Sequence, residues 1–130
     1  MENKFKLTLK KFHKIAVKLN IYLVISVIFA VIVFYFSVIP ETQIGPARNS
    51  GFLAHFVSYS ALSLLLLFCL IGKKLHNPAF KAALLVGSYG FFIELVQLLI
   101  PYRNFEFTDI IINYAAAFTI FFVYILFTKS

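Results

Sequence analysis

Hydrophobic and polar positions divide this chain into four long apolar runs that are separated by short polar segments. Each run is close to the roughly 20 residues that an α-helix needs to cross about 30 Å of hydrocarbon. The pattern therefore predicts an all-α, polytopic membrane protein with four transmembrane helices. We expect these helices at residues 21–39, 52–71, 82–100 and 109–127, with a break at Pro78 before the third.

The composition supports this assignment. With 62% hydrophobic and 13% charged residues, the chain departs from the roughly 25% charged residues of a usual globular domain. The segments between the apolar runs are too short for a separate soluble domain, so residues 1–130 are expected to form a single membrane domain. The one cysteine, Cys69, excludes an intramolecular disulfide and a zinc-binding cysteine pair.

The basic residues are distributed unevenly and predict the orientation of the chain. Ten of the twelve Lys and Arg residues precede the first run, lie between the second and third or follow the fourth, whereas Arg48 and Arg103 lie on the other side. By the positive-inside rule, both termini are expected in the cytoplasm, in a multi-pass protein of the cell membrane. The net charge of +7 then requires no nucleic acid as a partner.

Residues 1–20 form a basic tail in which apolar and lysine positions separate on a helical wheel. Such an amphipathic helix is expected at the inner headgroup surface, with membrane lipids as its partner and about 1 kcal/mol of attraction per Lys close to anionic lipid. The apolar run that follows is longer than the apolar region of a signal peptide and ends without an Ala-x-Ala pattern. We therefore expect an uncleaved first span.

The polar residues inside the predicted helices gather at one membrane face. They flank the short connection at residues 101–108 or open the second run: His55, Tyr59, Glu94, Gln97, Asp109 and Asn113. Successive spans run in opposite directions, so these positions share a depth. One stripe of the third helix holds Gly87, Gly90, Glu94, Gln97 and Pro101. We expect this face to pack inward because small residues allow close helix approach and polar residues hydrogen-bond across it.

A purely structural explanation competes with a functional one. Polar residues between membrane helices often act only as hydrogen-bond glue, holding the helices together with about 0.6 kcal/mol each. This explanation stays open for His55, Tyr59, Gln97 and Asn113. A helix cap is the corresponding alternative for Asp109. Glu94 is harder to explain, because an ionisable group costs at least about 2 kcal/mol near the bilayer centre and needs a partner, water or a proton. Together, Glu94, Arg103 and Asp109 favour a function.

These residues also carry a resemblance. The ordered segments His55-Phe56-Val57-Ser58-Tyr59, Glu94-Leu95-Val96-Gln97, Pro101-Tyr102-Arg103, Asp109 and Asn113 are similar to the pattern H-x3-Y, E-x2-Q-x3-P-x-R, D-x3-N of the VanZ-like family of small membrane proteins. The similarity covers roughly residues 40–122. Where many members carry Asp-Lys shortly before the histidine, this chain has Gly51-Phe52, and Ala116-Ala117 replaces glycines. The resemblance implies a membrane location, but it does not imply a particular reaction. The protein after which the family is named is associated with low-level resistance to the glycopeptide antibiotic teicoplanin.

The first functional hypothesis is an outward-facing polar pocket that binds or modifies a lipid or a lipid-linked envelope component. The catalytic candidates are Glu94 or Asp109 as general base and His55 as proton carrier. The ligand-binding candidates are Arg103, Gln97, Asn113 and Tyr59, with Arg103 as a clamp for phosphate or carboxylate. Metal coordination by His55, Glu94 and Asp109 is a weaker alternative, because no tight spacing such as HExxH is present, and we predict no metal and no cofactor.

Two other functions compete with this hypothesis. The protein could act without catalysis, by assembling with a partner or with itself as a homo-oligomer; substitutions at small interface residues should then be as damaging as those at Glu94. A small transporter is the third hypothesis, although four short helices do not easily enclose an alternating-access path and no pair of broken helices is apparent. The residues name no reaction, so the sequence leaves open whether the protein is an enzyme.

Overall fold

The computed structural model describes the backbone of residues 2–18, 20–40 and 51–128, and the side chains of residues 6–15, 20–40 and 51–128. These residues form five α-helices and no strand: α1 (Glu2–Lys18), α2 (Ile21–Val38), α3 (Gly51–Gly72), α4 (Pro78–Gln97) and α5 (Phe107–Thr128). Helices α2 to α5 are each long and apolar enough to span a membrane. The predicted all-α fold with four membrane spans is confirmed, and the cytoplasmic orientation of the termini stays a prediction.

The third span lies about one helical turn earlier in the chain than predicted, at both of its ends. Helix α4 begins at Pro78 and ends at Gln97, rather than covering 82–100. Pro78 stands in the first turn, where its missing N–H costs nothing and its fixed φ suits a helix, and Asn77 before it adopts a left-handed conformation with φ 49°. After Gln97 the chain continues in tight turns, with the N–H of Ile100 donating to the Gln97 carbonyl at 3.0 Å. Pro101 therefore lies beyond the helix and outside its polar stripe.

Helix α5 also starts earlier than predicted, at Phe107. Asp109 therefore lies inside the first helical turn, and its N–H donates to the Glu106 carbonyl at 3.0 Å. The helix-cap alternative for Asp109 is wrong, because the residue is not at the cap position. The predicted irregular loop at residues 40–51, which contains Arg48, lies almost wholly outside the described residues, as does Lys129.

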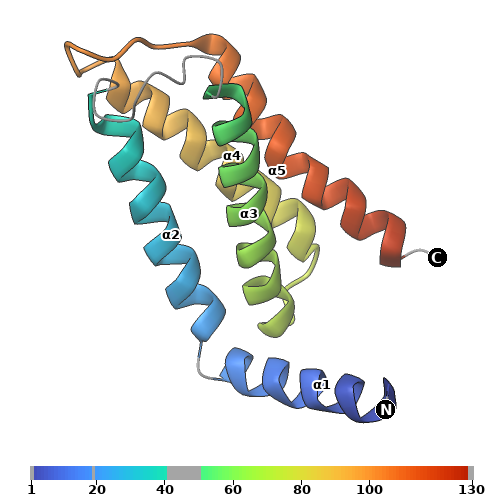
Figure 1. Cartoon of the computed structure of the whole chain (residues 1–130). Helices are drawn as coiled ribbons and strands as arrows, with labels where there is room; N and C mark the ends of the chain where they lie inside the picture. The colour runs from blue at the N-terminus through green and yellow to red at the C-terminus, as the bar shows by residue number, and fades with distance from the viewer. Residues whose placement is uncertain (1, 19, 41–50, 129–130) are drawn as a thin grey trace.

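Helices α3, α4 and α5 pack against one another, and α2 lies along their side (Figure 1). Small residues allow this close packing: a Cβ atom at Gly90 would lie 2.8 Å from atoms of both Asn113 and Tyr59. Helix α4 buries nine residues, whereas α2 buries Ser26 and Val33 alone. The remaining surfaces of the spans are rich in exposed Leu, Ile, Val and Phe, as expected for side chains that face lipid.

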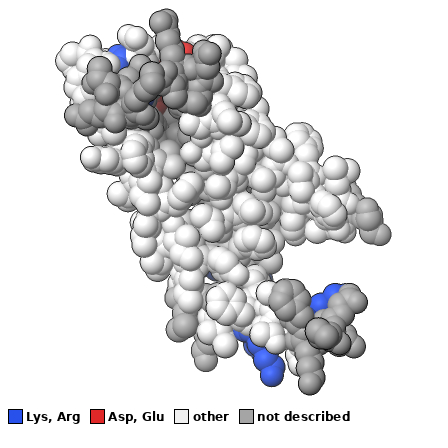
Figure 2. Space-filling model, in the orientation of Figure 1, with Lys and Arg blue, Asp and Glu red and all other residues white. Residues whose placement is uncertain are grey.

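Helix α1 runs crosswise to α2, at the end of the bundle opposite the 98–106 connection (Figure 1). The apolar side chains of Leu9, Phe12 and Ile15 are exposed, and Lys and Arg side chains are visible at the same end (Figure 2). A helix with an unburied apolar face and a basic polar face is typical of segments that lie in a membrane interface. The predicted amphipathic N-terminal helix is therefore present.

Candidate functional site

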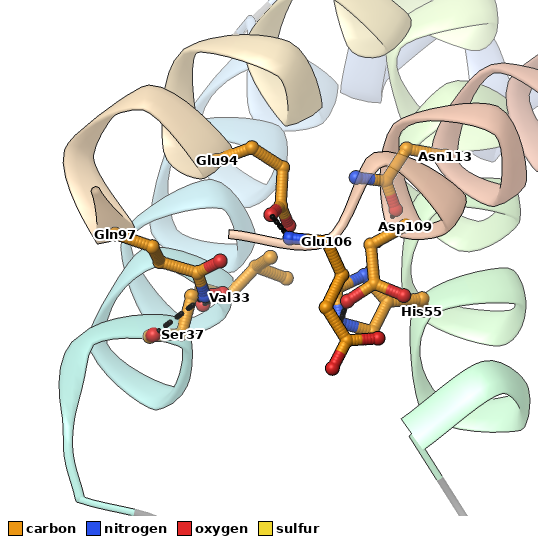
Figure 3. A network of polar contacts seen from close by, with 8 residues as sticks. All are labelled: Val33, Ser37, His55, Glu94, Gln97, Glu106, Asp109 and Asn113. Carbon is orange, nitrogen blue, oxygen red and sulfur yellow. Dashed lines mark hydrogen bonds and ion pairs between the residues drawn. The ribbon is translucent and has the colours of Figure 1, made fainter. Parts of the chain in front are cut away.

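Four polar side chains from three helices meet at the end of the bundle away from α1 (Figure 3). His55 lies near the start of α3, Glu94 near the end of α4, and Asp109 and Asn113 near the start of α5. They meet because consecutive spans alternate in direction, so two helix starts and one helix end share a depth. We call this group of His55, Glu94, Asp109 and Asn113 the polar cluster.

His55 connects α3 to two side chains of α5. Its Nδ1 lies 2.9 Å from the Asn113 Oδ1, and its Nε2 lies 3.5 Å from the Asp109 Oδ2. An amide oxygen only accepts hydrogen bonds, so with the Asn113 amide as placed the Nδ1 carries a proton and donates it. The ring also stacks on Tyr59, with centroids 6.0 Å apart and an interplanar angle of 6°. These contacts fix the ring and turn Nε2 toward Asp109.

Glu94 is completely buried and incompletely satisfied. Its Oε2 accepts a long hydrogen bond of 3.4 Å from the backbone N–H of Glu106, while its Oε1 has no partner among the described residues. The Tyr59 hydroxyl and the Asn113 Nδ2 are likewise buried without a partner in the described part of the chain. Leaving a buried polar group unpaired costs about 1–3 kcal/mol. Hydrogen-bond glue between helices does not explain three unpaired groups at one place.

The ionisable members of the polar cluster lie close together. Ligand atoms of His55, Glu94 and Asp109 all lie within 4.8 Å of one another. Arg103, half-buried in the 98–106 connection, acts electrostatically on Glu94 together with His55 and Asp109. Two carboxyl groups, an imidazole and a nearby guanidinium can exchange protons with a ligand, or hold an anionic or cationic group between them.

Two other predicted site residues lie outside the polar cluster. Gln97 joins two helices, and Tyr59 lies deeper in the bundle than His55. The Gln97 Nε2 donates to the Ser37 carbonyl at 2.9 Å, which ties the end of α4 to the end of α2 (Figure 3). The last carbonyls of a helix lack partners within the helix, so this amide satisfies one of them. Tyr59 is buried beneath His55, and its hydroxyl has no hydrogen-bond partner within the described ranges.

Sequence reasoning missed two serines below the polar cluster. The Ser60 and Ser63 hydroxyls each donate to a backbone carbonyl of α5, at Ala116 and Ala117, over 3.2 Å. The spacing gave a signal, since Ser63 continues the i, i+4 series of His55 and Tyr59. The role of Glu106, whose backbone N–H reaches Glu94, had no signal because it depends on how the connection folds back.

An apolar groove of about 170 Å³ opens between α2, α3 and α4, toward the α1 side of the polar cluster. Its lining combines residues of α2, α3 and α4: Leu23, Ser26, Val27, Ala30, Leu62, Leu66, Leu85, Val86 and Tyr89. The Tyr89 hydroxyl donates to the Ala30 carbonyl at 2.6 Å and so closes one side. With this apolar lining, the groove suits an acyl chain better than a headgroup.

Four apolar spans, with a buried Glu94 and two partly buried ionisable side chains at one end, define a polytopic integral membrane protein with a polar site at that end. A family model described as VanZ/LLP1 matches residues 3–128, nearly the whole chain. The chain therefore belongs to the VanZ/LLP1 family, which confirms the resemblance in its motifs and extends it to the basic N-terminal helix. No curated protein and no solved structure matches it.

Proposed function

We propose that the polar cluster binds the headgroup of a lipid or of a lipid-linked envelope component at the outer face of the membrane. The observation that carries the proposal is Glu94, a fully buried carboxyl group beside His55 and Asp109, one oxygen of which has no partner among the described residues. Ionisable residues inside a membrane are costly and usually serve a function. A polar headgroup at this place would supply partners to Glu94, to the Tyr59 hydroxyl and to the Asn113 amide.

The surroundings of the polar cluster fit an amphiphilic ligand. Arg103 provides a permanent positive charge at this end, suited to a phosphate or carboxylate. The apolar groove between α2, α3 and α4 lies toward the α1 end, where it could take part of an acyl chain. The proposal extends to modification of the ligand, because carboxylate and imidazole groups within 4.8 Å of one another can accept and pass on a proton.

The outer location rests on the charge distribution. Lys73 and Lys74 follow α3 at the α1 end, whereas the polar cluster and Arg103 lie at the opposite end. The positive-inside rule favours a cytoplasmic α1 end. Cysteines introduced in a Cys69→Ser background at the exposed positions Asn104 and His76 check this orientation. A membrane-impermeant thiol reagent should label Asn104→Cys in intact cells and His76→Cys only after lysis; the reverse pattern would contradict it.

The main test compares the lipids that remain bound to purified protein. Mass spectrometry should find a specific amphiphile with the wild-type chain, reduced about tenfold in Glu94→Gln, which corresponds to about 1.4 kcal/mol. His55→Ala should lose the amphiphile as well. His76→Ala is the matched control, because His76 is exposed in the connection between α3 and α4.

Equal lipid content in wild type, Glu94→Gln and His55→Ala, at equal thermal stability, would refute the proposal. If the amphiphile is an envelope precursor, the same variants should change the teicoplanin susceptibility of cells that express the protein, whereas His76→Ala should not. This second measurement tests the link to glycopeptide resistance separately from the lipid binding.

A further inference from the structure

We infer that His55, Glu94 and Asp109 form a binding site for one divalent cation, with Zn²⁺ as the best fit. The three residues come from three helices, and their ligand atoms lie within 4.8 Å of one another. The inference that an ion binds does not depend on the proposed function. A role for the ion in holding a headgroup rests, in addition, on the proposed function.

The donor set matches a known class of metal ligand. One imidazole nitrogen and two carboxylates offer a mixture of nitrogen and oxygen without thiolate, which suits Zn²⁺ and next Mn²⁺. Three protein ligands leave a fourth position on a tetrahedral ion, the arrangement typical of a zinc site that also binds a ligand or water. A phosphate or carboxylate oxygen would have the right chemistry for that position.

The hydrogen bonds around His55 support metal binding independently of the distances. Metal-ligating histidines usually donate their second ring N–H to an oxygen, and here Nδ1 faces the Asn113 Oδ1 at 2.9 Å. The remaining nitrogen, Nε2, then points its lone pair at the Asp109 Oδ2, 3.5 Å away. Two acceptors that face each other need a positive species between them, either a proton or a metal ion.

Glu94 distinguishes between these two species. A proton on Nε2 would satisfy the His55–Asp109 pair but would leave the buried Glu94 Oε1 without a partner among the residues described. One cation in contact with all three side chains satisfies both. Within the set of three ligands the ion also balances charge, since two carboxylates and a neutral imidazole carry two negative charges that a divalent ion neutralises; the Arg103 guanidinium, which also acts on Glu94, lies outside this set. A neutral assembly is far less costly inside a membrane than separate charges.

The three side chains must close around the ion. Donors about 2.0–2.1 Å from a tetrahedral ion lie about 3.3 Å apart, so the widest pair must approach by roughly 1.5 Å. His55 and Asp109 retain 18% and 23% exposure of their side chains, which leaves room for that movement. Their positions near the starts of α3 and α5 also place them where rotation disturbs little of the apolar core.

The test measures metal binding by purified chain in detergent. After EDTA treatment and its removal, the wild type should bind one Zn²⁺ per chain by isothermal titration and elemental analysis, with weaker binding of Mn²⁺. Glu94→Gln and His55→Ala should lose at least 100-fold in affinity. Asn113→Ala should lose about 10–100-fold, the usual effect of removing the partner that orients a ligating histidine. His76→Ala should bind like the wild type.

Thermal unfolding distinguishes variants that lose the metal site from variants that fail to fold. In EDTA the wild type and Glu94→Gln should unfold at similar temperatures, and added Zn²⁺ should raise the unfolding temperature of the wild type alone. Absence of a stoichiometric site in the wild type, or equal Zn²⁺ affinity in a folded Glu94→Gln, would overturn the inference. Lipid retention measured on the EDTA-treated samples then tests the proposed function on its own, because its dependence on Glu94 does not require the ion.

Discussion

At the α1 end of the bundle, α3 and α4 meet through Leu67, Leu70, Ala79 and Ala82, whereas at the opposite end the same helices meet around His55 and Glu94. The apolar end closes by fitting large side chains against small ones, with aromatic rings of α5 packed over them. The polar end buries a carboxyl group, one oxygen of which finds no partner in the part of the chain that the structure describes. The contrast indicates that apolar packing joins the helices at the α1 end, whereas the burial of Glu94 at the other end calls for a different explanation.

The largest effect on stability is expected at the apolar end. Ala82 is completely buried among Leu67, Leu70 and Ala79, and Ala82→Leu would place extra carbon atoms in a filled space. Overpacking of this kind typically destabilises by about 1–3 kcal/mol, and we expect the upper part of that range. Thermal unfolding in detergent micelles measures it. The control is Ala115→Leu, because Ala115 is exposed on α5. A tolerated Ala82→Leu would break the comparison.

A smaller effect is expected where the two regions meet. A Cβ atom at Gly90 would lie 2.8 Å from Asn113 and Tyr59, so Gly90→Ala forces two buried side chains to shift. We expect a loss of about 1–2 kcal/mol in stability. Zn²⁺ affinity should fall as well, because Asn113 orients His55. Gly51→Ala is the matched control, since nothing lies within 4 Å of a Cβ atom there. Unchanged Zn²⁺ affinity in Gly90→Ala would show that the two regions are independent.

The smallest effect should follow the loss of one interhelical hydrogen bond. Ser63 donates to the Ala117 carbonyl at 3.2 Å, and Ser63→Ala should cost about 0.6 kcal/mol, the average for such bonds in membrane proteins. Zn²⁺ and lipid binding should stay unchanged, as measured by titration and mass spectrometry. If Ser63→Ala impaired binding as strongly as Glu94→Gln, the distinction between residues that only join helices and residues that bind a ligand would be wrong for this protein.

The sequence was sufficient to predict the spans and the meeting of His55, Glu94 and Asp109, because helix rise and alternating direction determine depth. It could not predict that Gln97 turns to the Ser37 carbonyl of α2, since the rotation of each helix about its axis follows from packing. The grouping of possible metal ligands was underestimated for a related reason. The three possible ligands come from three different helices. A local motif such as HExxH detects only ligands that are close in sequence on one helix.

The light attachment of α2 has a consequence for how a ligand reaches Glu94. In the described part of the chain, α2 is tied to α4 by the hydrogen bonds Tyr89–Ala30 and Gln97–Ser37, and the groove opens on the α1 side of the first bond. An amphiphile already in the membrane leaflet would reach the contact between α2 and α4 by lateral diffusion. It could enter from the side while its acyl chain stays in the hydrocarbon. Residence in the bilayer, rather than concentration in water, would then govern how often the site is filled.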